Sequence, residues 1–100
     1  MSWVKEALNG LNAGKSVRVR PQGGSMRGRI ESGQWVTIEP VSADSVQVDD
    51  VVFIRWKGNY ILHIVKERGE AGLLIGNNLG KINGWANPED VLGIVTEIGN

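Results

Sequence analysis

The chain has 100 residues, 41% of them hydrophobic, and this length and composition predict a single globular domain over residues 1–100. Eleven basic residues balance eleven acidic ones, and the zero net charge argues against a general nucleic-acid binder, which normally carries a basic excess. The lack of cysteine and the single histidine exclude disulfides, thiol nucleophiles and Cys- or His-rich metal sites, and no residue pattern calls for a cofactor.

The N-terminal segment, residues 1–14, is predicted to be helical. Ser2 can cap the helix, and Gly10 and Gly14 fall where it should end. The apolar residues that recur on one helical face are Trp3, Val4, Ala7, Leu8 and Leu11. We expect this helix to act as a lid over one end of the core.

Residues 15–98 are predicted to form a β core of about six short strands. The β-rich runs cover residues 16–21, 35–40, 51–56, 60–65, 72–76 and 91–98. Residues 57–59 read as a three-residue hairpin loop, residues 82–85 as an Asn-Gly turn, and Gly93 as a bulge or a close approach. Strands this short usually protect their edges by closing, so the expected fold is mainly β, a small barrel or curled sheets with one short N-terminal helix.

The stretch GGSMRGRI, residues 23–30, places one serine in a glycine-rich piece of backbone. Serine attacks a carbonyl only with a base within hydrogen-bond reach and donors for the developing oxyanion. His63 is the candidate base, because it shares a strand face with Ile61 and Val65, whose aliphatic side chains disfavour its charged form. Lys66 is predicted to point to the opposite face. A lone histidine on an apolar strand is more often a hydrogen-bonded structural residue, so spacing alone leaves both interpretations open.

Five blocks of the sequence follow the order found in the serine peptidases typified by signal peptidases and LexA-type repressors. The first block is matched by Gly23, Ser25, Met26, Ile30 and Gly33, and the second by Asp50, Val51 and Val52. His63 falls at the position of the general base, Gly76 and Asn78 match the fourth block, and Gly93 matches the last. The chain resembles this superfamily over about residues 17–95.

The resemblance implies a signal-peptidase-like or LexA-like fold with Ser25 as nucleophile and His63 as base. It also implies that the peptide N–H of Ser25 lies in or near the oxyanion hole. Gly23 and Gly24 would let a substrate strand approach closely. The substrate-binding or orienting residues expected from the match are Gly23, Gly24, Met26, Asn77 and Asn78.

Four positions depart from the superfamily pattern. Gly28 replaces a usual proline, Gln34 an acidic residue, and Asp49 a glycine. Asn77 lies where the histidine-type members have an aspartate that orients the imidazole. An amide can orient a ring but adds no charge, and losing that charge can cost about 10⁴ in rate. Proteolysis is therefore expected to be compromised.

We expect a serine endopeptidase that cuts an extended peptide with Ser25 and His63. A narrower form is self-processing after Ala13, since Ala13-Gly14 resembles the bonds that the repressors cut. The alternative is a catalytically degenerate peptidase fold that binds a peptide or protein partner along a strand edge. Nucleic-acid binding is a weaker hypothesis, because acidic residues can balance the basic and aromatic ones that suggest it: Trp3, Lys15, Arg18, Arg20, Arg27, Arg29 and Trp35.

No apolar run approaches the ~20 residues that span a bilayer, and the first residues lack the apolar core of a signal peptide. We therefore expect a soluble cytoplasmic protein without a membrane anchor. Because 24 residues precede Ser25, we also expect no DNA-binding domain of the kind that the repressors carry.

Overall fold

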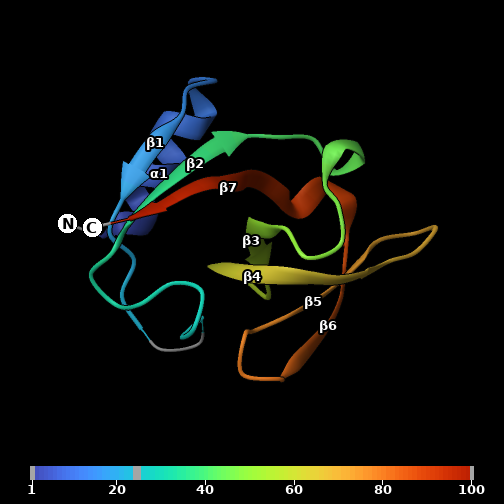
Figure 1. Cartoon of the computed structure of the whole chain (residues 1–100). Helices are drawn as coiled ribbons and strands as arrows, with labels where there is room; N and C mark the ends of the chain where they lie inside the picture. Colours follow the sequence, from blue (N-terminus) through green and yellow to red (C-terminus); the bar gives the residue numbers. More distant parts are fainter. Residues whose placement is uncertain (1, 24–25, 100) are drawn as a thin grey trace.

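The computed structural model describes residues 2–23 and 26–99, which form one seven-stranded antiparallel sheet and one α-helix (Figure 1). The helix is α1 (Trp3–Asn12), and the strands are β1 (Val17–Val19), β2 (Trp35–Pro40), β3 (Val51–Trp56), β4 (Asn59–Arg68), β5 (Leu73–Gly76), β6 (Ile82–Ala86) and β7 (Val91–Gly99). Two short 3₁₀ helices, η1 (Ala43–Ser45) and η2 (Pro88–Asp90), precede β3 and β7. The strand order is β1-β2-β7-β3-β4-β5-β6, so β7 joins the first two strands to the rest of the sheet.

The predicted N-terminal helix is confirmed, with both of its ends satisfied. The Val4 N–H donates to Ser2 Oγ over 3.1 Å, and the Lys15 N–H donates to the Gly10 carbonyl over 3.0 Å. Ala7 and Leu11 are buried, and α1 packs on β1 and β2 (Figure 1). The helix therefore covers one face of the sheet beside β1 and β2.

Both faces of the central strand β3 are buried, which gives the domain two apolar cores. Val51 and Phe53 belong to the core under α1, and Val52 and Ile54 to the core on the opposite face. Phe53 is fully buried between two aromatic rings, edge-on to Trp3 and stacked with Tyr60. This arrangement fixes β4, the neighbour of β3, between the two cores.

The sheet is neither closed nor curled, so the expected barrel or curled sheets are not found. Within the described ranges β1 pairs only with β2, and β6 only with β5. The two edge strands are instead short or irregular. The edge strand β1 has only three residues, and β6 contains Gly84 (φ +142°) beside a register shift. Short or irregular edge strands resist pairing with other chains, so closure is unnecessary here.

Two turn predictions are wrong and one glycine prediction is confirmed. Trp56 pairs with Asn59, so the β3–β4 loop has two residues, Lys57 and Gly58, both with positive φ as in a type I′ turn. Residues 82–85 lie inside β6, because the preceding turn already closes at residues 77–81. A Cβ on Gly93 would lie 2.6 Å from an Ile38 methyl group, so β7 does approach its neighbour closely there.

Candidate functional site

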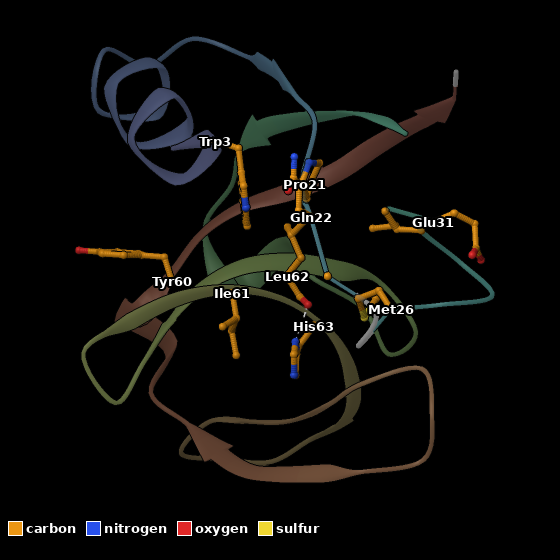
Figure 2. A pocket seen from close by; sticks show the side chains of 11 residues that line it. Trp3, Pro21, Gln22, Met26, Glu31, Tyr60, Ile61, Leu62 and His63 are labelled. Carbon is orange, nitrogen blue, oxygen red and sulfur yellow. Dashed lines mark hydrogen bonds between the residues drawn. The ribbon is translucent and has the colours of Figure 1, made fainter. Parts of the chain in front are cut away.

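A cavity of about 210 Å³ opens beside β4 and faces the segment that follows β1 (Figure 2). Its walls come from Trp3 of α1, from residues 21–23, 26, 30 and 31, and from residues 60–63 of β4. Consecutive residues of a strand point to opposite faces, so a cavity lined by four of them must lie along the strand edge. The candidate site is therefore an edge groove, lined largely by apolar side chains.

This edge of β4 is open because its pairing with β5 begins only at Ile64. Val65 exchanges backbone hydrogen bonds with Asp49 and Asp50 on the β3 side, over 2.7 and 2.9 Å. Backbone groups alternate sides along a strand, so those of Tyr60 and Leu62 face away from β3, toward the cavity. The groove thus offers main-chain donors and acceptors of the kind that an added strand uses.

His63 lies at one end of this edge and shares a face with Ile61 and Val65, as predicted. The side chain is buried, and Nδ1 contacts the Leu62 carbonyl oxygen (Figure 2). A carbonyl only accepts, so the neutral ring carries its proton on Nδ1, and Nε2 keeps its lone pair. In this tautomer the ring is a proton acceptor through Nε2.

Burial lowers the pKa of His63 below its ordinary value of 6.5, because the charged ring loses solvation. The hydrogen bond to Leu62 opposes this shift, while the charges of Lys81 and then Lys66 lower the pKa further. Lys66 is the extra residue of a β-bulge between Val65 and Glu67. Its side chain passes close to Gly76, the partner of Ile64, which agrees with its predicted place on the face opposite His63. His63 is therefore neutral at neutral pH.

The segment that carries the predicted nucleophile reaches the cavity from the other side. Gly23 and Met26 both line it, and Met26 is buried in the core under α1. The predictions for Gly24 and Ser25 fall outside the described residues. Of the predicted substrate-binding set, Gly23 and Met26 are thus at the cavity together with His63.

Residues 26–31 form a tight turn held by several hydrogen bonds. The Met26 carbonyl accepts from the N–H groups of Arg29 and Ile30, over 3.0 and 2.8 Å. The Gly28 N–H donates to Glu31 Oε2 over 2.7 Å, and Gly28 has a φ of +97°. Proline is fixed near −65° and lacks the N–H, so it could not replace Gly28 in this turn. The departure from the superfamily at Gly28 therefore has a local structural cause.

The other departures also have structural partners. Asp49 has a φ of +80°, the left-handed region in which glycine is favoured, and its carboxylate pairs with Arg29. The Gln34 side-chain oxygen accepts from the Glu31 N–H over 2.8 Å, closing the loop before β2. These contacts hold the loop after residue 25 against the β2–β3 connection.

Asn77 and Asn78 serve the β5–β6 turn. Asn77 Oδ1 accepts from the N–H groups of Leu79 and Lys81, each over 2.9 Å. The Asn78 side-chain N–H donates to the Arg27 carbonyl over 2.8 Å, which ties this turn to the segment after residue 25. That Asn77 orients His63 stays a prediction, and the recorded bonds of its oxygen lie within its own turn.

Three features of the site were not identified from the sequence. Trp3, which was predicted on the apolar face of the helix, is a wall of the cavity. Glu31 stands at its rim with its carboxylate turned outward (Figure 2). Tyr60, at the start of β4, is the third of these cavity residues. Trp3 is the first residue of α1, so the N-terminal end of the helix lies beside the site.

No three His, Asp or Glu side chains within residues 2–23 and 26–99 lie close enough together to hold a metal ion. In the same part of the chain, no helix has the length and apolar character needed to cross a membrane. No protein-family model matches the chain, and no curated protein is significantly similar to its sequence. The resemblance to the serine peptidases therefore rests on the motif residues themselves.

Proposed function

We propose that this chain is a serine-peptidase-like domain that binds an extended peptide along the open edge of β4 and cuts it with Ser25. One observation carries the proposal: Gly23 and Met26, which flank residues 24–25, line the same cavity as His63. Tyr60 directs its backbone groups and Leu62 its N–H to this side, so a peptide strand can add there through main-chain hydrogen bonds, while the Leu62 carbonyl contacts His63 Nδ1. The relation to the signal peptidases and LexA-type repressors is part of this proposal.

In the proposed reaction Nε2 of His63 accepts the hydroxyl proton of Ser25 while Oγ attacks the peptide carbonyl carbon. The resulting tetrahedral oxyanion is stabilised by backbone N–H groups, and the imidazolium then gives its proton to the departing amine. Water hydrolyses the acyl ester in a second, equivalent step that restores Ser25. The lowered pKa of His63 supports the first proton transfer, because the base is already neutral.

The same environment limits the rate. Burial and the charges of Lys81 and Lys66 disfavour the imidazolium that forms during the reaction, and no carboxylate of the described residues offsets them. Charge loss from a catalytic triad can cost about 10⁴ in rate. A second candidate function follows from this observation: a domain that binds a peptide on the β4 edge and does not cut it.

The two functions are separated by one experiment with the natural chain and Ser25→Ala. Each protein is incubated with a peptide library, cleavage products are identified by mass spectrometry, and retained peptides are recovered in parallel. The proposal predicts cleavage that Ser25→Ala abolishes, with the same peptides still bound. Cleavage that persists in Ser25→Ala refutes Ser25 as the nucleophile. Peptides retained equally by both proteins, with no cleavage by either, establish the binding domain instead.

Self-processing after Ala13 needs a larger change. Ala13 and Gly14 form the hydrogen-bonded end of α1, whereas Trp3 at the other end of the helix lines the cavity. Ten residues of helix span about 15 Å, so α1 must unwind or a second molecule must act. We therefore propose that any processing at this bond is intermolecular. Its rate, followed by intact mass, should rise with protein concentration, and a concentration-independent rate contradicts this.

A further inference from the structure

Two arginines stack on one tryptophan where β1 and β2 run side by side (Figure 1). The guanidinium carbons of Arg18 and Arg20 lie 4.9 and 5.3 Å from the centroid of the Trp35 ring. Val19, between the two arginines, is buried in the core under α1, so Arg18 projects from the opposite face of β1, while Arg20 follows the end of the strand. Stacking on an aromatic face restricts a guanidinium group without using its N–H donors.

Arg20 is held further by its own loop. Its Nε donates to the Gly33 carbonyl over 3.1 Å, which leaves the two terminal nitrogens to face a ligand. No carboxylate of residues 2–23 or 26–99 forms an ion pair with Arg18 or Arg20. The guanidinium group of Arg20 is thus oriented before a ligand binds. Less conformational entropy is then lost when it forms a bidentate contact with a carboxylate.

The stack adjoins the groove described above. A second, more open cavity of about 580 Å³ is lined by Arg20, Trp35, Trp3 and Gln22, together with Ser2 and Glu6. Trp3 and Gln22 also line the cavity beside β4, so the two hollows share a wall. A peptide in the groove can therefore place a side chain against Arg20.

We propose that Arg18, Arg20 and Trp35 form a subsite for an acidic side chain of the bound peptide, a placement that rests on the proposed function. Acidic residues border the subsite on two sides. Glu6 lines the same hollow as Arg20. Glu97 of β7 and Arg18 of β1 pair with opposite sides of Thr37 in β2. A nucleic-acid strand needs a continuous basic track for successive phosphates, which this bordered pair of arginines does not supply. The two positive charges of Arg18 and Arg20 match one or two carboxylates of a peptide.

The test uses Ser25→Ala, so that binding is measured without cleavage. An end-capped hexapeptide of alternating Glu and Thr is titrated against its Gln and Thr counterpart, with NMR signals of Arg20 Nε–H, the Trp35 indole and the Leu62 amide as reporters. The Glu peptide should shift all three and bind about tenfold more tightly, the usual worth of one charge-assisted contact. Adding Arg20→Gln should make the two peptides equal, while Arg55→Gln, which removes a partner of Asp90, should change neither.

Equal affinity for the two peptides, with the Leu62 amide shifting in both, refutes the subsite and leaves the groove intact. Shifts at Arg20 without any at Leu62 refute the placement beside the groove. A thymidine hexanucleotide that binds as tightly as the Glu peptide assigns the stack to nucleic acid and overturns the proposal.

Discussion

Gly28 combines a left-handed backbone with a close neighbour, and Gly28→Ala tests both at once. Its φ is +97°, and a Cβ built there would lie 2.7 Å from Asn78 Nδ2, well inside contact distance. The Asn78 amide donates to the Arg27 carbonyl, so it can move away only by giving up that hydrogen bond. The substitution therefore strains the turn that follows the predicted nucleophile and detaches it from the β5–β6 turn.

The two costs can be estimated separately. An L-residue in the left-handed region costs about 1–2 kcal/mol, and a net intramolecular hydrogen bond is worth about 0.5–1.5 kcal/mol. Gly28→Ala should thus lower the free energy of unfolding by about 1.5–3.5 kcal/mol. Gly80 is the matched control, because its φ is +95° and no atom lies within 4 Å of its added Cβ. Gly80→Ala should cost only the backbone strain.

The assay is urea unfolding followed by tryptophan fluorescence, for both variants in the natural and Asn78→Ala backgrounds. In the natural background Gly28→Ala should cost about 1 kcal/mol more than Gly80→Ala. That excess should disappear when Asn78 is alanine, because the displaced amide is gone. Equal costs in the natural background, or an excess that survives Asn78→Ala, would refute the contact between the two turns.

Three further predictions concern stability. His63 has a lowered pKa in the folded chain, so its contribution to stability is complete above about pH 6.5 and is lost as the pH falls below that value, where the unfolded chain takes up the proton. His63→Gln should flatten this decline in urea unfolding between about pH 8 and about pH 5, and an unchanged decline contradicts the pKa shift. Phe53→Ala should cost about 3–5 kcal/mol by urea unfolding, because Phe53 is fully buried; a loss under about 2 kcal/mol would mean that the cores repack. Asp49→Gly should leave the thermal midpoint nearly unchanged, because relief of the positive φ offsets the loss of the exposed ion pair with Arg29. Asp49→Ala should lower the midpoint, because it loses the ion pair and keeps the backbone strain. Equal thermal midpoints for the two variants would contradict this.

The helix and most strands were predictable from the sequence because their signals are local. Ser2 and the apolar spacing of α1 define the helix, and alternation around Val17 and Val36 defines β1 and β2. Turns were less predictable. The chain reverses direction after Asn77, whose side-chain oxygen accepts hydrogen bonds from two backbone N–H groups of the turn. The Asn83-Gly84 pair is a typical turn signal, but it lies inside β6 because the reversal is already complete before it.

Closure of the sheet and the layout of the site depend on contacts between distant residues. Sequence alternation placed His63 correctly among aliphatic side chains, but it did not reveal that Lys81 and Lys66 lie close enough to lower the pKa of the ring. The cavity joins Trp3, Met26 and His63, which are far apart in the chain, and no local pattern reports their meeting. The departures at Gly28 and Asp49, in contrast, are explained by backbone angles that only the structure reveals.

The central claim is that Ser25 attacks a peptide carbonyl at the β4 edge with His63 as its base. The most direct test is modification by a serine-directed fluorophosphonate, with the adduct located by tandem mass spectrometry in the natural chain and in His63→Gln. The account predicts an adduct on Ser25 in preference to the other serines, formed about 10²-fold more slowly without the His63 base. No preference for Ser25, or an equal rate in His63→Gln, would contradict it.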